Sequence, residues 1–256
     1  MQLPDYEYKG LMAQAWDVLR GDTSKWADRF FYLDLIQTHG QPVLDVGCGT
    51  GRLLLDYIKL GIDMDGVDNS PEMLDICRQK AAKQGLTVNL YEQYLEELHL
   101  PRKYQVILIP SSSIQLIIQP EQVQQSLKNL YQLLLPSGIL VASIMTLWNP
   151  GDDLFSQWEK TAQDPENGNQ YRRVAKSWFD PQTECERTED LYQLIIDGVV
   201  VKEELHQRSP ATRSYTQLQA KQLFESAGFQ ETTFYHEFSF EPVKETDTLF
   251  TVVARK

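Results

Sequence analysis

The chain has 256 residues, 42% hydrophobic and 23% charged, which suits a globular protein with one large α/β domain and an insert. Its net charge of −12 disfavours a nucleic acid partner, because polyanions are bound mainly through clustered Lys and Arg. There is no apolar run long enough to cross a membrane, no secretory signal, and no Cys or His spacing typical of metal sites, so we expect a cytoplasmic protein that binds neither membrane nor metal.

Up to residue 146 the sequence alternates between helical periodicity and short apolar stretches. Ser70 and Pro71 mark a helix start, because Ser caps free backbone amides and Pro fits the first turn. Strands that alternate with helices predict a parallel sheet with right-handed crossovers. The predicted helices cover residues 24–37, 52–60, 71–84 and 121–134, and the predicted strands cover the run PVLDVG and residues 62–67, 87–91, 104–109 and 139–146.

The alternation stops after Trp148 and resumes with a helix at Thr216. Between them, Asp197-Gly198 lies between two apolar runs and predicts a tight type I′ hairpin. We therefore predict a doubly wound, seven-stranded, mostly parallel α/β sheet with an antiparallel β insert. The predicted parts are an N-terminal helical segment with the cofactor-binding core (1–148), an insert or lid over the acceptor site (149–213), and the last helix and two strands (214–256).

The decisive stretch contains Gly47, Gly49 and Gly51 between a predicted strand and a helix. Glycines there permit a sharp turn and let a ligand approach the backbone, while the amides at the helix start face that ligand. Asp68 ends the next strand, where a carboxylate can accept hydrogen bonds from both hydroxyls of a ribose. This spacing predicts a ligand that contains adenosine. The alternatives are a tight turn without a ligand and, for Asp68, a helix cap.

Arg52 separates two classes of cofactor. A dinucleotide fingerprint requires G-x-G-x-x-G, and Arg52 occupies the position of its last glycine. The chain also lacks the phosphate-binding lysine of a G-x-x-x-x-G-K-[ST] loop. A nicotinamide-dependent oxidoreductase therefore remains an alternative that Arg52 disfavours.

The run DVGCGTG, followed by GVDNSPEML, resembles motif I and its acidic successor in class I S-adenosylmethionine-dependent methyltransferases. YQVILIPSSSIQLI resembles the fourth strand of that family, and LLLPSGILVASI its fifth-strand motif. The segment SYT…LFESAGF is similar to the region before the sixth strand in small-molecule N- and O-methyltransferases. The resemblance covers residues 43–229, is weakest in the insert, and implies an antiparallel last strand.

The resemblance also implies S-adenosyl-L-methionine as cofactor and S-adenosyl-L-homocysteine as product. The expected cofactor residues are Asp45, Gly47, Cys48, Gly49 and Gly51 in the glycine loop, Asp68 at the ribose, Asn69, Met73, Gln93 and Tyr94 around the adenine, and Pro110 beside the sulfonium. The expected acceptor-pocket residues are Trp16, Ser111, Ser112, Trp148 and Arg213. Helix packing is the alternative for Met73, a polar strand end for the serines, the core for Trp148, and a surface ion pair for Arg213.

Methyl transfer asks little of a catalytic residue, because the methyl group is already bonded to a positive sulfur. Positioning and desolvation can supply most of the acceleration, and a general base assists an amine or alcohol acceptor. The candidate bases are Asp17, His206 and His236, and no motif singles out any of them.

The predicted function is methyl transfer from S-adenosylmethionine to nitrogen or oxygen of a small metabolite, by a monomer or homodimer. Besides the oxidoreductase, one alternative is a non-catalytic cofactor-binding or assembly module. Another is methylation of RNA or protein, which the negative charge disfavours.

Overall fold

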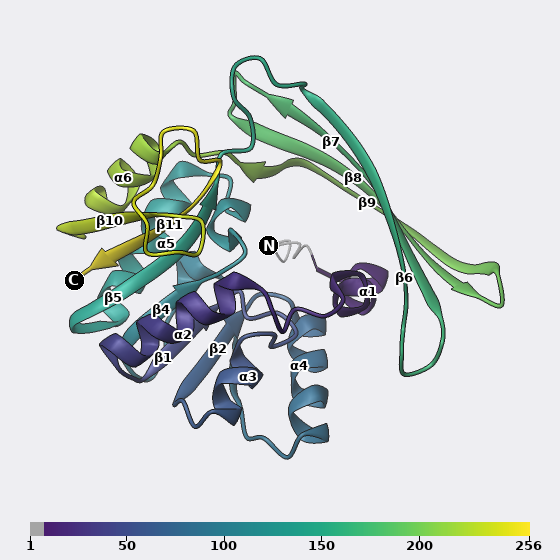
Figure 1. Cartoon of the computed structure of the whole chain (residues 1–256), viewed down its shortest axis with the longest axis horizontal. Helices are drawn as coiled ribbons and strands as arrows, with labels where there is room; N and C mark the ends of the chain where they lie inside the picture. Colours follow the sequence, from purple (N-terminus) through teal and green to yellow (C-terminus); the bar gives the residue numbers. More distant parts are fainter. Residues whose placement is uncertain (1–7) are drawn as a thin grey trace.

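The computed structural model describes residues 8–256, which form two sheets side by side (Figure 1). The seven-stranded sheet, here the main sheet, has the order β10-β11-β5-β4-β1-β2-β3, and sheet B has the order β6-β7-β8-β9. The main sheet comprises β1 Val43–Val46, β2 Met64–Asp68, β3 Asn89–Glu92, β4 Tyr104–Ile109, β5 Leu134–Met145, β10 Glu231–His236 and β11 Leu249–Arg255. The helices are α1 Gly10–Arg20, α2 Ala27–His39, α3 Leu54–Lys59, α4 Pro71–Lys83, α5 Pro120–Leu133 and α6 Gln217–Ser226, with 3₁₀ turns η1 Leu95–Glu97 and η2 Ser113–Leu116.

The predicted fold class is confirmed. Strands β1 to β5 pair in parallel, and β11 pairs antiparallel with both β5 and β10. The Ser70 side chain accepts a hydrogen bond from the Met73 amide, which confirms the predicted helix start. The first predicted helix begins at Ala27 rather than at residue 24, and its Trp26 N-cap is extended.

Helices cover both faces of the main sheet, and the central strands are therefore apolar at almost every position. In β4, Val106 and Leu108 pack with α2, α3 and α4, whereas Ile107 and Ile109 pack with α5 and α6. All four side chains are fully buried. This two-sided packing leaves the carboxyl ends of the strands as the open edge of the sheet, where ligands of such folds bind.

Sheet B contains β6 Phe155–Gln163, β7 Gln170–Asp180, β8 Cys185–Ile196 and β9 Val199–Arg213, all antiparallel. Asp197 and Gly198 join β8 to β9 with φ angles of 50° and 78°, both left-handed as a type I′ turn requires. The predicted hairpin is therefore confirmed. No helix among residues 8–256 is both long and apolar enough to span a membrane.

Helix α1 lies between sheet B and the core (Figure 1). Its apolar side chains, including Leu11, pack against Tyr171 and Tyr192 of sheet B. Its first turn is bound from two sides, because the Gly10 amide donates to Glu72 of α4 and the Leu11 amide donates to Glu204 of β9, both at 2.7 Å. Two carboxylates at a helix N-terminus also stabilise the helix dipole, so α1 connects the two sheets.

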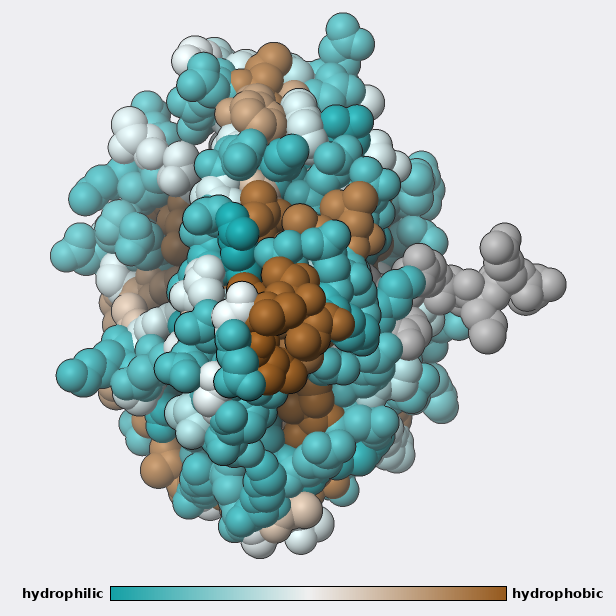
Figure 2. Space-filling view, turned by 90° about the vertical axis from the view of Figure 1, so that its right-hand side faces the viewer, coloured by the Kyte–Doolittle hydropathy of each residue, from teal (hydrophilic) through white to brown (hydrophobic). Residues whose placement is uncertain are grey.

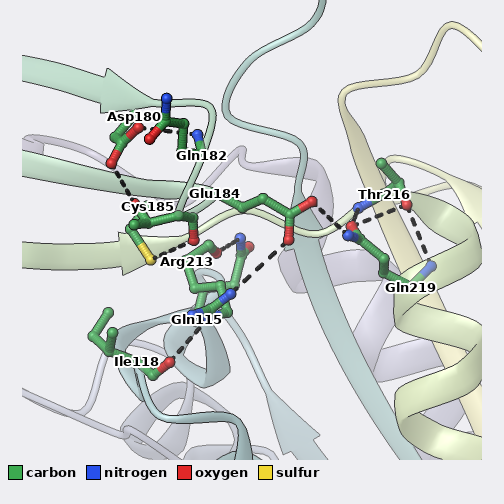
Figure 3. A network of polar contacts seen from close by, with 10 residues as sticks. Gln115, Ile118, Asp180, Gln182, Glu184, Cys185, Arg213, Thr216 and Gln219 are labelled. Atoms are coloured by element: carbon green, nitrogen blue, oxygen red, sulfur yellow. Dashed lines mark hydrogen bonds and ion pairs between the residues drawn. The ribbon is translucent and has the colours of Figure 1, made fainter.

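A polar network attaches the base of sheet B to the core (Figure 3). The Arg213 guanidinium donates to the Ile118 carbonyl at 2.9 Å and lies 3.9 Å from the Glu184 carboxylate. Glu184 also accepts a hydrogen bond from Gln219 of α6 at 2.7 Å. Gln115 donates a hydrogen bond to the Arg213 carbonyl at 2.6 Å, so the end of β9 and the turn between β7 and β8 are tied to the same corner of the core.

Candidate functional site

A cavity of about 420 Å³ opens at the carboxyl ends of β1, β2 and β4. Parts of α1 and the Arg208 side chain of β9 complete its wall, so sheet B contributes to it. Trp16 and Ser111, both predicted for the acceptor pocket, line this cavity. So do most of the residues predicted for the cofactor, namely Gly47, Cys48, Gly49, Asp68, Asn69, Met73, Gln93 and Tyr94.

The glycine loop lies so close to its neighbours that side chains would not fit. A Cβ atom on Gly47, whose φ is +69°, would lie 2.8 Å from the Ser113 hydroxyl oxygen. A Cβ atom on Gly51, whose φ is +82°, would lie 2.5 Å from the Cys77 sulfur. Gly51 itself does not line the cavity, so its small size serves the packing of α4 against the loop.

Asp68 links the glycine loop to the end of β2. One carboxylate oxygen accepts a hydrogen bond from the Gly49 amide at 2.8 Å, and the other accepts one from the Ser70 amide at 2.9 Å. Burial raises the pKa of Asp68, although these backbone hydrogen bonds oppose the shift. Each carboxylate oxygen has a second lone pair, so Asp68 can still accept the hydroxyls of a ribose. Its role toward Ser70 and a role toward a ligand are therefore compatible.

Asp45 lies beneath the loop and does not line the cavity. Its side chain is buried, and its Oδ1 atom has no hydrogen-bond partner among residues 8–256. Burial raises its pKa to about 7, against the attraction of Arg52. Arg52, at the position of the missing fingerprint glycine, forms an ion pair with Asp28 of α2 and borders the cavity.

We expect Asp45→Asn to change how stability depends on pH. Because the pKa of Asp45 is raised from 3.8 to about 7 in the folded chain, the folded state binds more protons between these values, and stability falls as pH rises through them. The Asn variant should therefore have a higher free energy of unfolding than the parent, by up to about 4 kcal/mol well above pH 7, and should lose this advantage toward pH 4. Urea unfolding across this range measures the difference, and parallel pH profiles would contradict the prediction.

Ser111 and Ser112 follow β4 with φ angles of 55° and 57°, in the left-handed region. Such angles are costly for residues other than glycine and often mark functional sites. The Ser112 amide donates to the Ser143 hydroxyl at 3.0 Å, which helps to hold this conformation. Ser111 lines the cavity, whereas Ser112 does not.

Ser112→Gly is expected to raise the free energy of unfolding by about 0.5 to 1 kcal/mol, because relief of the left-handed strain exceeds the entropy cost of glycine. Ser112→Val should lower it by more than about 1 kcal/mol, since a β-branched side chain is least tolerated there. Both variants keep the amide that donates to Ser143. Thermal unfolding of the two side by side tests the strain, and a lower melting temperature for Ser112→Gly would argue against it.

Arg20, at the last turn of α1, also lines the cavity, and the sequence analysis did not single it out. Its guanidinium donates to the Ser111 hydroxyl at 3.0 Å and lies over the rings of Trp16 and Trp26, at 4.7 and 5.3 Å from their centroids. Burial and the charge of Arg52 lower its pKa. Arg20 forms no ion pair with a carboxylate in the part of the chain that the structure describes. A partly buried cation placed in this way is suited to an anionic group of a ligand.

Gln93 lines the cavity, but its side chain also bonds to the backbone of His99. The His99 amide donates to the Gln93 side-chain oxygen at 2.8 Å. Glu96, which was not predicted, provides a carboxylate at the cavity next to Tyr94. The side-chain amide of Gln93 thus holds the loop after β3. The carboxylate at this part of the cavity is that of Glu96, in η1.

Several predicted acceptor-pocket residues lie away from the cavity. The Trp148 ring stacks on Phe179 with centroids 5.7 Å apart. Arg213 belongs to the attachment of sheet B (Figure 3). Pro110, which was predicted for the cofactor, does not line the cavity either, and its carbonyl accepts a hydrogen bond from the Ser113 hydroxyl at 2.7 Å.

None of the three candidate bases lines the cavity. Asp17 accepts the Thr50 hydroxyl at 2.7 Å and pairs with Lys80 at 2.9 Å. His206 borders a second cavity, between α1 and sheet B, and lies 3.2 Å from Glu204. His236, the last residue of β10, lies 2.9 Å from Asp247.

Taken together, a doubly wound sheet, a glycine loop after β1 and an acidic residue after β2 define a nucleoside-binding α/β protein. Residues 43–138 match the methyltransferase domain family. A candidate methyltransferase of Geobacillus sp. (strain WCH70) is 28% identical over 215 residues, which is 84% of each chain.

Solved structures share the fold over nearly the whole chain. An S-adenosylmethionine-dependent methyltransferase from Clostridium acetobutylicum is 20% identical, with a TM-score of 0.73 over 95% of this chain and 96% of that one. The sugar N-methyltransferase KedS8 from Streptoalloteichus sp. is 17% identical, with a TM-score of 0.73 over 100% and 99% of the two chains. Residues 43–138 thus match a methyltransferase domain, and the chain as a whole has the fold of S-adenosylmethionine-dependent methyltransferases of known structure.

Proposed function

We propose that the chain transfers the methyl group of S-adenosylmethionine to nitrogen or oxygen of a small metabolite, with the cofactor in the cavity at Gly47, Gly49 and Asp68. The observation that carries this proposal is the hydrogen bond from the Gly49 amide to Asp68, because it joins the glycine loop and the predicted ribose acceptor in one cavity. The cofactor supplies a methyl group on a positively charged sulfur.

The residues of the cavity fit the parts of such a cofactor. Asp68 would accept the ribose hydroxyls, and Asn69, Met73 and Tyr94 would border the adenine. Arg20 would bind the carboxylate of the methionine part, since it is a partly buried cation without a carboxylate partner among residues 8–256. Asp45 would act from below the loop, through the backbone that it supports.

The acceptor would enter on the side of Ser111, where Ile117 and Ile118 give the cavity an apolar wall. Sheet B, within residues 149–213, would serve as a lid, which is supported by the presence of Arg208 of β9 in the same wall. No candidate base borders the cavity, so the chain would act chiefly by orienting the acceptor and excluding water. Cys48, Cys77 and Cys185 are buried and form no disulfide, which supports a reducing compartment such as the cytoplasm.

Calorimetric titration of the purified chain with S-adenosylmethionine, S-adenosylhomocysteine and NAD tests the cofactor. We expect micromolar binding of the two sulfur compounds and none of NAD; preference for NAD would overturn the proposal in favour of an oxidoreductase. The acceptor is then sought by detecting S-adenosylhomocysteine in a panel of amines and hydroxylated metabolites. Amino sugars come first in this panel, because a structural neighbour is a sugar N-methyltransferase. Cofactor binding without turnover on any acceptor would favour the non-catalytic module.

A further inference from the structure

We propose that Trp26 positions the Arg20 guanidinium for the carboxylate of the cofactor. This inference rests on the proposed function and adds a positioning residue to it. Trp26 does not line the cavity, so its indole ring would act through Arg20 rather than on the ligand. Arg20 lines the cavity and donates to Ser111, at the end where the methionine part of the cofactor would lie.

The Trp26 ring contacts two guanidinium groups. Trp26 is the N-cap residue of α2, at the end of the short segment 21–26 that follows α1. The Arg20 guanidinium lies 5.3 Å from the centroid of the ring, and the Arg52 guanidinium lies 5.2 Å from the same centroid. Both distances are typical of a cation–π interaction, in which the negative face of an aromatic ring attracts a cation. Both arginines line the cavity, so the ring joins two cations of its wall.

Arg52 gives the Trp26 ring a fixed neighbour. Its guanidinium forms an ion pair with Asp28 of α2, and these two side chains are only 11% and 6% exposed. Arg20 has no such carboxylate partner among residues 8–256, and a free arginine side chain populates many rotamers. The rings of Trp16 and Trp26, with centroids 4.7 and 5.3 Å from the Arg20 guanidinium, restrict it instead.

The electrostatic setting of Arg20 favours a ligand with a carboxylate. Burial and the charge of Arg52 lower the pKa of Arg20, which means that the protein alone does not fully balance its charge. A carboxylate at this place would balance it. Because Trp26 restricts the guanidinium before the ligand binds, less conformational entropy is lost on binding. The ring also shields part of the guanidinium from water, which strengthens its attraction to a carboxylate.

Calorimetric titration of the full chain with S-adenosylhomocysteine and with 5′-methylthioadenosine, which has no carboxylate, tests this inference. Trp26→Ala should weaken the binding of S-adenosylhomocysteine by about 10-fold and that of 5′-methylthioadenosine by less than about 3-fold. Trp26→Phe keeps an aromatic face and should bind both ligands within about 3-fold of the parent. Trp26→Leu keeps apolar volume without that face and should bind S-adenosylhomocysteine as weakly as Trp26→Ala.

Trp178→Ala is the matched control. Trp178 also has a guanidinium over its ring, that of Arg187 at 4.1 Å, but it belongs to β7 and does not line the cavity. Sheet B lies on the right in Figure 1, and this is the side of the molecule that faces the viewer in Figure 2. Trp178→Ala should therefore bind both ligands as the parent does. Melting temperatures of all variants separate loss of binding from loss of folding.

A double-mutant cycle identifies the residue through which Trp26 acts. In the Arg20→Ala background, Trp26→Ala should change the binding of S-adenosylhomocysteine by less than about 2-fold, because the guanidinium that the ring positions is gone. A further 10-fold loss in that background would overturn the inference. So would unchanged binding by Trp26→Ala, or an equal loss for both ligands, and none of these results would affect the proposed function. A parent that does not bind S-adenosylhomocysteine would instead overturn the proposed function, and this inference with it.

Discussion

Asp68→Ala is expected to weaken the binding of S-adenosylhomocysteine and S-adenosylmethionine by about 100-fold. In the proposed binding mode the substitution would remove two hydrogen bonds from ribose hydroxyls to a charged acceptor, each worth about 1.5 to 3 kcal/mol. It also removes the hydrogen bonds that Asp68 accepts from the Gly49 and Ser70 amides, at 2.8 and 2.9 Å. Part of the loss of affinity therefore comes from disorder of the glycine loop. Calorimetric titration measures the change.

The control is Asp75→Ala on α4. Asp75 is an exposed carboxylate that pairs only with Arg78 in the described residues, and it does not line the cavity. This variant should bind both ligands as the parent does. Asp68→Asn keeps one acceptor oxygen and should lose less affinity than Asp68→Ala. Equal binding by the parent and Asp68→Ala would mean that the ribose does not lie at the end of β2.

Arg20→Ala is expected to weaken the binding of S-adenosylhomocysteine by about 30-fold or more, because the proposed ion pair between Arg20 and the carboxylate of the ligand would be lost. Binding of 5′-methylthioadenosine, which contains the nucleoside and the sulfur but no carboxylate, should change by less than about 3-fold. The ratio of the two effects identifies the group that Arg20 binds. Arg20→Lys keeps the charge without the planar fork of donors and should give an intermediate result.

Arg78→Ala provides the comparison for this series, since Arg78 is half exposed on α4 and pairs with Asp75. It should leave both ligands unaffected. If Arg20→Ala weakened the two ligands equally, Arg20 would act on the shape of the cavity, through the Trp16 and Trp26 rings, rather than on the carboxylate.

The main sheet could be predicted from the sequence because each of its strands and helices is determined by a local sequence pattern. Each central strand is an apolar run buried on both faces, and each helix between them has its own start and stop residues, such as Ser70 and Pro71. The glycine loop could be predicted for a similar reason, since its positive φ angles and close contacts leave few alternatives to glycine. These features depend on neighbours within a few dozen residues.

The rest of the site depends on contacts between distant segments. Trp16 and Arg20 reach the cavity only because α1 packs on Tyr171 and Tyr192, more than a hundred residues later in the chain. A helical pattern of apolar residues does not show which other element of the fold those residues will contact. For the same reason the sequence could not reveal that Arg213 bonds to Ile118 and Glu184 at the base of sheet B.

The position of α1 also has a consequence for the order in which the chain folds. It is the first described helix to be synthesised, yet Leu11 donates its amide to Glu204, which is 193 residues away. Elements from β1 to α5 can assemble beforehand, because their partners lie close in sequence. A contact between such distant residues forms late, since it requires closure of a very long loop. On the ribosome, therefore, the wall of the cavity that contains Trp16 and Arg20 is completed only after sheet B has been made.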